Sequence, residues 1–258
     1  MTALSGEIPA VIPSVSGLST LEVRNLRKLY GRKVAVSDVS FLMHSGEVVG
    51  LLGPNGAGKT TVFYMLAGFL RPSAGKVMLD GNVLNTMSMY KRARHGISYL
   101  PQEPSIFRKL SVEDNILAVL EAKPGMNKSA RKRRAAELME EFGIASLARQ
   151  PGYTLSGGER RRTEIARALA IEPKFLLLDE PFTGIDPIAI HEIKKIIEEL
   201  SRAGIGVLLT DHNVRDALDI TDRSYIIHLG NIIVSGDRDA VLNDEKARSL
   251  YLGEQFRM

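Results

Sequence analysis

The chain has 258 residues, of which 44% are hydrophobic and 25% charged, and its formal net charge is +4. This length allows one large domain or two small ones, and the mild positive charge is well short of that of a nucleic-acid-binding tail. The absence of cysteine excludes a disulfide scaffold, cysteine-based catalysis and thiolate metal sites.

The first twenty residues mix Ser, Pro, Gly and small apolar residues without periodicity, so residues 1–20 are expected to form a mobile extension. They lack the basic start and the continuous apolar stretch of a signal peptide. No later apolar run approaches the ~20 residues that span a bilayer. We therefore expect a soluble chain that reaches a membrane only through a partner.

From residue 21 onward, short aliphatic runs alternate with longer helical patterns. Strands are expected at 21–24, 39–42, 47–52, 76–79, 97–100, 174–178, 205–210 and 224–228. The runs 48–52, 175–178 and 205–209 are apolar on both faces, as in strands that helices cover on both sides. This alternation predicts an α/β fold with a parallel core sheet.

The stretch that begins at Ser111 has two helical patterns with no strand between them. Ser111 and Asp114 have the spacing of a capping box that opens a helix over 115–121. Gly143 is typical of the residue that ends a helix, here one over 128–142. The stretch therefore predicts a small helical insert in the α/β core.

Two further signals lie nearer the C-terminal end. Asp186-Pro187 supplies a cap and a first-turn proline for a helix that runs to about residue 203. Gly230-Asn231 predicts the tight turn of a hairpin between strands at 225–229 and 232–235.

Residues Gly53 to Thr60 read GPNGAGKT and match the phosphate-binding pattern G-x-x-x-x-G-K-[ST]. They follow a buried strand and open a helix expected over 59–67, which is the context that the pattern requires. The glycines let backbone N–H groups curl around phosphate oxygens, and the helix N-terminus adds its positive end. Lys59 would reach the β- and γ-phosphates of a nucleotide, and Thr60 would ligate Mg²⁺.

An apolar strand ends in two carboxylates at Asp179 and Glu180. Such a pair alone is usually a solvated strand end or a helix cap. In a chain with a phosphate-binding loop, Asp179 is better interpreted as a Mg²⁺ ligand. Glu180 is then placed to polarise a water for attack on the γ-phosphate.

The motif LSGGE at residues 155–159 is the most discriminating pattern. Ser156 and Glu159 have capping-box spacing and open a helix expected over 160–170. The motif is compatible with a helix start that is simply well capped. It is also compatible with a second anion-binding helix end, because Gly157 and Gly158 leave the first-turn N–H groups uncovered. In the second case, two copies of the chain could complete each other's nucleotide sites.

Three single residues carry weaker signals. His212 follows an apolar strand and could contact the γ-phosphate, although a lone histidine there is more often a surface or cap residue. Gln102 precedes the helical insert and alone indicates little. Tyr30, expected in a loop before the second strand, is as compatible with stacking on a base as with a half-buried loop tyrosine.

In their order along residues 21–258, these motifs resemble those of an ABC-type ATPase cassette. The resemblance implies a mainly parallel core sheet, an antiparallel β subdomain, a helical subdomain at about 103–158 and a C-terminal tail at about 237–258. The extension over residues 1–20 is longer than the resemblance leads us to expect, and no role is assigned to it.

The resemblance also implies roles for the site residues, with ATP and Mg²⁺ as cofactors. ATP would be held by Tyr30, which stacks on adenine, and by Gly53, Pro54, Asn55, Gly56, Ala57, Gly58, Lys59, Thr60 and Thr61. The catalytic group would be Glu180 as base, His212 as γ-phosphate switch and Gln102, and the metal ligands Thr60, Gln102 and Asp179. The ATP of the other protomer would be capped by Ser156, Gly157, Gly158 and Glu159.

Four stretches resemble more narrowly the ATPases that drive lipopolysaccharide export in Gram-negative envelopes: residues 99–108, 155–162, 210–215 and 251–257. This likeness implies a homodimer on the cytoplasmic face of the inner membrane, beneath two membrane subunits. Phe107 and Arg108 would lie in the groove that receives a membrane subunit. From the residues alone, Phe107 is equally compatible with a core position under Ile116.

Two alternative functions stay open at this point. Cassettes for other substrates, such as branched-chain amino acids, share nearly all the catalytic motifs. A soluble ABC ATPase that acts on ribosomes or DNA is the other alternative. A single cassette, the absence of cysteine and the absence of long charged heptads argue against it, so no nucleic-acid partner is expected.

Overall fold

The computed structural model describes residues 17–253, so most of the expected extension at 1–20 and the last part of the expected tail lie outside the described residues. Within that range, ten strands form one sheet in the order β5-β4-β1-β2-β10-β9-β3-β8-β7-β6. The strands are β1 (Thr20–Tyr30), β2 (Lys33–His44), β3 (Val48–Leu52), β4 (Ala74–Leu79), β5 (Asn82–Val83), β6 (Ile97–Leu100), β7 (Phe175–Asp179), β8 (Gly206–Thr210), β9 (Arg223–His228) and β10 (Asn231–Gly236).

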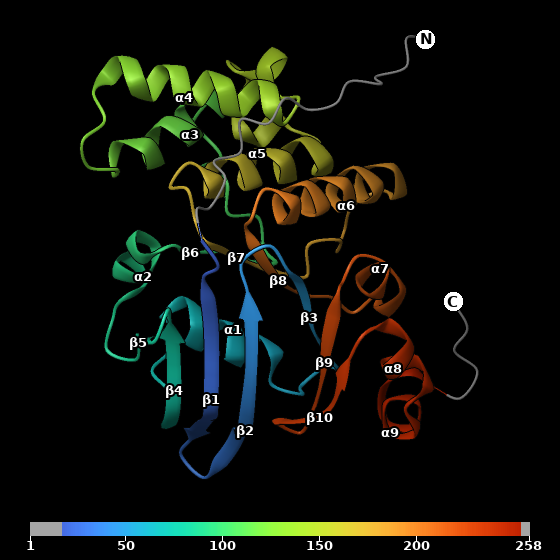
Figure 1. Cartoon of the computed structure of the whole chain (residues 1–258). Helices are drawn as coiled ribbons and strands as arrows, with labels where there is room; N and C mark the ends of the chain where they lie inside the picture. The colour runs from blue at the N-terminus through green and yellow to red at the C-terminus, as the bar shows by residue number, and fades with distance from the viewer. Residues whose placement is uncertain (1–16, 254–258) are drawn as a thin grey trace.

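Helices connect and cover these strands (Figure 1). They are α1 (Lys59–Ala67), α2 (Met89–His95), α3 (Val112–Glu121), α4 (Lys128–Glu141), α5 (Gly157–Leu169), α6 (Pro187–Arg202), α7 (Val214–Leu218), α8 (Arg238–Asn243) and α9 (Glu245–Ala247). Short turns η1 (Ala145–Leu147), η2 (Gly152–Thr154) and η3 (Arg248–Leu252) complete the list. None of the helices in the described range is both long and apolar enough to cross a bilayer.

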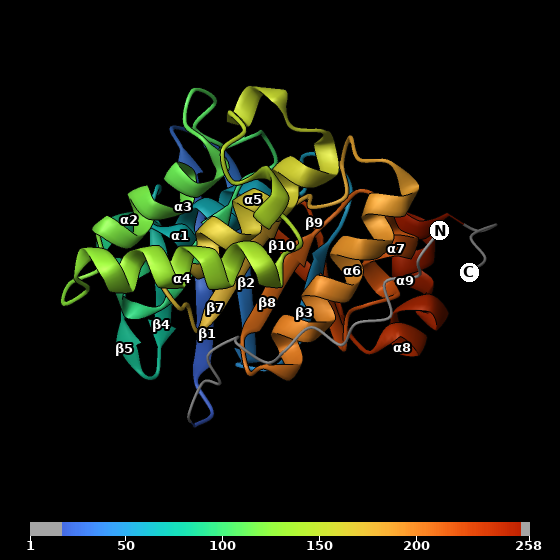
Figure 2. The same cartoon turned by 90° about the horizontal axis from the view of Figure 1, so that it is seen from above.

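The sheet has a parallel and an antiparallel part. Strands β6, β7, β8, β3 and β9 pair in parallel, whereas β1 pairs antiparallel with both β2 and β4. Helices α3, α4 and α5 gather at one end of the molecule, whereas α7, α8 and α9 lie beside β9 and β10 (Figures 1 and 2). The predicted α/β fold with a mainly parallel core sheet is confirmed.

The central strands are buried on both faces, as their composition predicts. Every residue of β3, β7 and β8 is buried. In β7, Leu176 and Leu178 pack into one core with α3 to α6, whereas Phe175 and Leu177 face a second core with α1 and β2. Because helices cover both faces, the three parallel strands are held in place and their carboxyl ends lie at the same edge of the sheet.

The structure corrects several boundaries. Strands β1 and β2 extend well beyond 21–24 and 39–42, because they pair with each other as far as Tyr30 and Lys33 despite their polar residues. The two-residue strand β5 and helix α2 were not predicted from the sequence. The hairpin turn lies at Leu229-Gly230, one residue earlier than expected, since these two residues have the positive φ values, 47° and 77°.

The predicted capping residues are confirmed, but two helices begin earlier than expected. Ser111 caps α3 by accepting the Asp114 N–H (3.0 Å), and the residues between cap and acceptor are already helical. Ser156 and Glu159 form the expected reciprocal capping box, so α5 begins at Gly157. Asp186 accepts the first N–H groups of α6, with a proline at its first turn.

Glu141, the last residue of α4, is a buried acid without a hydrogen-bond partner among the described residues. Only 7% of its surface is exposed. Burial raises its pKa, nearby Arg134 opposes the rise, and Glu199 and Glu137 add to it. The ionised side chain therefore costs stability in the folded protein.

We predict that Glu141→Gln stabilises the chain above neutral pH. The folded pKa is raised, so the cost of the charge is fully present above that pKa and disappears as pH falls below the unfolded value. Urea unfolding at pH 8 should give a higher midpoint for the variant, and the gap should close toward pH 4. Glu140→Gln, at the exposed neighbour, is the control and should show neither effect.

Candidate active site

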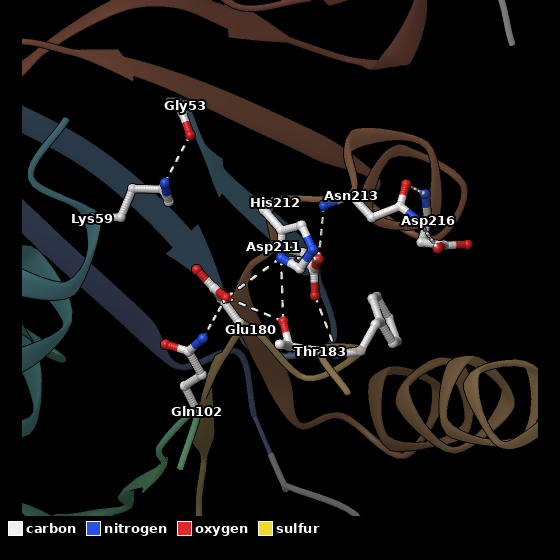
Figure 3. A network of polar contacts seen from close by, with 10 residues as sticks. Gly53, Lys59, Gln102, Glu180, Thr183, Asp211, His212, Asn213 and Asp216 are labelled. Carbon is white, nitrogen blue, oxygen red and sulfur yellow. Dashed lines mark hydrogen bonds and ion pairs between the residues drawn. The ribbon is translucent and has the colours of Figure 1, made fainter. Parts of the chain in front are cut away.

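The residues that directly follow three parallel strands lie at one edge of the sheet. Strand β3 leads into the loop of residues 53–58, β7 into Glu180, and β8 into Asp211 and His212. Because neighbouring parallel strands end at the same edge, these residues meet although they are far apart in the sequence (Figure 3). The edge is the candidate active site.

The phosphate-binding loop is folded around the side chain of Lys59. Its Nζ donates to the carbonyl oxygens of Gly53 (2.7 Å) and Pro54 (3.1 Å). Burial lowers the pKa of Lys59, and the surrounding carboxylates of Glu180, Asp179 and Asp211 oppose this. A buried ammonium inside a ring of backbone groups at the start of α1 is suited to hold phosphate.

Asp179 is buried at the end of β7 with one direct partner. The Tyr99 hydroxyl donates to its Oδ2 (3.1 Å), and only 3% of the residue is exposed. Burial raises the pKa of Asp179, and the bond from Tyr99 opposes the rise. Sequence reasoning missed Tyr99, since a tyrosine in a strand indicates packing as readily as hydrogen bonding.

The donor set at this edge fits Mg²⁺. The Thr60 hydroxyl, the Asp179 carboxylate and the Gln102 amide are hard oxygen donors of the type that Mg²⁺ takes. Residues 17–253 contain no group of three or more His, Asp or Glu side chains arranged to hold a metal.

Glu180 is the centre of a small polar network. Its Oε2 accepts from Gln102 Nε2 (2.8 Å) and Thr183 Oγ1 (3.1 Å), and lies 3.4 Å from His212 Nδ1 (Figure 3). Its φ of 46° is unusual for a residue with a long side chain, and its N–H is held by the Thr210 carbonyl (2.9 Å). Such backbone strain clusters at functional sites.

The structure thus brings the expected Gln102, Glu180 and His212 together. It adds Thr183, which also lies 3.2 Å from His212 Nδ1. It also adds Asp211, which is fully buried and accepts the N–H groups of Phe182 and Asn213. Burial raises the pKa of Asp211. Its place beside His212 at a buried strand end was the signal that could have found it.

The residues of the LSGGE motif lie apart from this network. No hydrogen bond or ion pair in the described part of the chain joins residues 156–159 to the phosphate-binding loop. Ser156 is exposed at the start of α5, and a Cβ on Gly158 would lie 2.9 Å from the Cβ of Ala189 on α6. The motif therefore presents a helix end to solvent while its second glycine packs within the chain.

Tyr30 is the last residue of β1, not a loop residue as expected. Its side chain is half exposed, and the Lys28 ammonium lies 5.3 Å from the ring centroid. An accessible ring at the end of β1 is available to stack on a planar group.

Phe107 lines a cavity of about 960 Å³ between α1, α2, β6, α3 and α5. It is 48% exposed, which contradicts a core position under Ile116. Asn115 holds its backbone through both N–H (2.8 Å) and carbonyl (3.1 Å), and the Arg167 guanidinium lies 4.9 Å from the ring centroid. Arg108 is exposed beside it but does not line the cavity.

Comparison with known proteins identifies the family and the fold. The family described as "ABC transporter" matches residues 36–183, more than half of the chain. This chain belongs to the ABC transporter family. It is an ATP-binding subunit of such a transporter and an ATPase, as the sequence motifs predict.

Relatives cover nearly the whole chain. The "Lipopolysaccharide export system ATP-binding protein LptB" of Haemophilus influenzae is 53% identical over 93% of this chain and 100% of its own length. The protein of the same name from Escherichia coli has the same identity and coverage. A "Probable ABC transporter ATP-binding protein" of Azorhizobium caulinodans is 55% identical over 93% of the chain and 85% of its own length.

Solved structures agree with the cassette fold. The ADP conformation of MJ1267, an ATP-binding cassette of an ABC transporter, has a TM-score of 0.82 and 28% identity, and the match covers 92% of this chain and 99% of that one. A dimeric post-hydrolysis state of the ATP-binding cassette MJ0796 with ADP and Pi has a TM-score of 0.76 and 25% identity, covering 84% and 98%.

Proposed function

We propose that the chain is the ATPase of a lipopolysaccharide exporter and works as a homodimer on the cytoplasmic face of the inner membrane. Hydrolysis is supported chiefly by the position of the Glu180 carboxylate. It accepts a hydrogen bond from Gln102 at the edge of the sheet where Lys59 also lies. The substrate is supported by the 53% identity to LptB proteins over their full length.

Each site residue takes one task in hydrolysis. The loop from Gly53 to Thr61 and the Lys59 ammonium hold the β- and γ-phosphates. Thr60, Gln102 and Asp179 would hold Mg²⁺, which would supply neutralisation of the phosphate charge when bound. Glu180 orients a water and takes up its proton for attack on the γ-phosphate.

Two residues complete this arrangement within the chain. His212, whose Nδ1 is within 3.4 Å of Glu180 Oε2, senses the γ-phosphate. Tyr30 stacks on adenine through its accessible ring. Both roles come from the family resemblance, and the positions of the two side chains are compatible with them.

The composite site is assembled between two copies. Ser156, Gly157, Gly158 and Glu159 expose a capped helix end that has no task in its own chain's site. A helix N-terminus is an anion-binding group, so it can cap ATP bound to the facing protomer. The dimeric state of the MJ0796 cassette supports this arrangement.

The membrane subunits dock on the cavity at Phe107. It lies at the junction of the core with the proposed helical subdomain, about residues 103–158. Of the proposed C-terminal tail, about 237–258, helices α8 and α9 lie beside β9 and β10. The segment before Phe107 is fixed to α5, because Glu164 Oε1 accepts the N–H groups of Ser105 and Ile106. A docked partner would therefore respond to movements of the helix that carries the LSGGE motif.

We predict that Glu180→Gln keeps ATP binding within a few-fold of wild type and lowers turnover by at least about 100-fold. The amide preserves the shape of the side chain but cannot accept the proton of the attacking water. Phosphate release and nucleotide affinity should be measured on the same preparation, with Glu192→Gln at an exposed site of α6 as control. Phosphate release at the wild-type rate would remove Glu180 from this role.

We predict that Phe107→Ala leaves the ATPase activity of the isolated chain unchanged but abolishes assembly with the membrane subunits. Aromatic anchors at an interface typically cost ~2 kcal/mol or more on truncation. The matched control is Val83→Ala, at an equally exposed apolar residue of β5 outside the cavity. Normal assembly of the Phe107 variant would contradict docking at this cavity.

The substrate is tested on the intact complex. We expect a complex isolated in mild detergent with its membrane subunits to carry lipopolysaccharide, identified by mass spectrometry of the bound lipid. Stimulation of ATPase activity by a branched-chain amino acid, with no bound glycolipid, would instead favour an uptake system. Recovery of the chain with ribosomes or DNA would contradict the transporter function altogether.

A further inference from the structure

A hairpin from the C-terminal half of the chain lies beside the phosphate-binding loop. Its strands β9 and β10 occupy the sheet between β3, which leads into the loop, and β2. The turn that joins them, Leu229-Gly230, has φ values of 47° and 77°, the pattern of a type I′ turn. Gly230 is buried, although connecting turns ordinarily lie at the surface. The turn is therefore packed against another part of the chain.

Gly230 connects the phosphate-binding loop to β2 through its backbone. Its N–H donates to the carbonyl oxygen of Ala57 in the loop (2.9 Å), and its own carbonyl accepts from the N–H of Ser37 on β2 (2.8 Å). A Cβ at Gly230 would lie 2.8 Å from the Ser37 nitrogen and 2.9 Å from the Cα of Val36. These are backbone atoms, which cannot move aside as a flexible side chain does. A substitution here would push the turn away from β2 or from the loop.

The hydrogen bond to Ala57 sets the direction of the next N–H group in the loop. A peptide unit is planar and trans, so its carbonyl and its N–H point in opposite directions. The Ala57 carbonyl points to Gly230, and the N–H of the same unit, that of Gly58, therefore points away from the turn. Among residues 17–253, none accepts a hydrogen bond from this N–H. Gly58 is the N-cap of α1, where free N–H groups bind phosphate.

Asn231 fixes the neighbouring peptide unit in the same way. Its Nδ2 donates to the carbonyl oxygen of Leu229 (3.1 Å), which belongs to the same unit as the Gly230 N–H. Two peptide units therefore act in series, because Asn231 orients the first and the first orients the second through Ala57. The free end of this series is the N–H of Gly58.

The chain contains a second turn of the same kind that lacks these contacts. Asp80-Gly81, between β4 and β5, has φ values of 50° and 78°, and Asn82 Nδ2 donates to the Asp80 carbonyl (3.3 Å). A Cβ at Gly81 would meet nothing within 4 Å. The local geometry of such a turn therefore needs neither burial nor contact with a loop. The position against Ala57 is what distinguishes the turn at 229–230.

We propose that Gly230 and Asn231 are positioning residues of the nucleotide site, which through Ala57 aim the Gly58 N–H at a phosphate group. Both residues act through the loop and not on the reacting atoms. Because the series of peptide units ends on the loop, its effect belongs to the phosphates of the ligand and not to its base. The inference rests on the proposed phosphate-binding role of residues 53–61.

The test compares two pairs of matched variants in the full chain. Gly230→Ala displaces the turn, whereas Asn231→Ala only releases the Leu229 carbonyl and decides the test alone if the first variant does not fold. We expect ADP affinity to fall at least about tenfold in the first, since a hydrogen bond to a charged group is lost, and about threefold in the second. The KM for ATP should rise by the same factors. Gly81→Ala and Asn82→Ala make the same changes in the exposed turn and should bind ADP as the wild type does.

Inorganic tripolyphosphate, which has no base, separates an effect on the phosphates from an effect on the base. Its affinity, measured by displacement of a fluorescent ADP analogue, should fall in Gly230→Ala and Asn231→Ala by the same factors as that of ADP. A loss for ADP alone would mean that the turn acts on the base through β2 and Tyr30, and would overturn the proposal.

Two further outcomes would overturn it. One is wild-type ADP affinity in either variant of the turn at 229–230. The other is an equal loss in Gly81→Ala and Asn82→Ala, since the effect would then come from turn stability and not from contact with the loop. Wild-type protein that binds neither ADP nor tripolyphosphate would instead contradict the proposed role of residues 53–61, so the two failures are distinguishable.

Discussion

The electrostatic balance between one buried ammonium and its acidic neighbours governs this site. Lys59 lies among Asp179, Glu180 and Asp211, and burial acts against the charges of Lys59, Asp179 and Asp211. Like charges at such close quarters repel strongly in a medium of low dielectric constant. The three carboxylates outnumber the one ammonium and would repel the phosphates of a nucleotide without a cation. This charge excess therefore favours a nucleotide that binds together with a counter-ion.

The sheet makes this balance possible. Strands buried on both faces, such as β3, β7 and β8, are apolar along most of their length and bring charged residues to a shared edge where they end. The strained backbone of Glu180 is maintained by this frame, since its N–H is fixed to the neighbouring strand end at Thr210. The rigid sheet thus holds the flexible, polar residues within hydrogen-bond distance of one another.

Sequence reasoning found the residues whose signal is local. The phosphate-binding loop, Asp179, Glu180 and the capped helix at Ser156 are each marked by a strand end or a helix start in adjacent residues. Thr183 and Tyr99 have no such mark, because their contacts depend on how distant segments pack. The lengths of β1 and β2 were missed for a similar reason: their pairing with each other outweighs the polar residues that interrupt the strand pattern.

Gly158 has a consequence for how substitutions in the LSGGE motif are interpreted. Its missing side chain lets α5 approach α6 at Ala189, within one subunit and without any nucleotide. An alanine there would force two helices apart, so a loss of transport in such a variant would report misplacement of the helix as much as loss of a nucleotide contact. In a mutational scan, Gly157 separates the two causes better than Gly158, because a Cβ on Gly157 would meet only the Gly184 carbonyl oxygen at 3.8 Å, an ordinary contact.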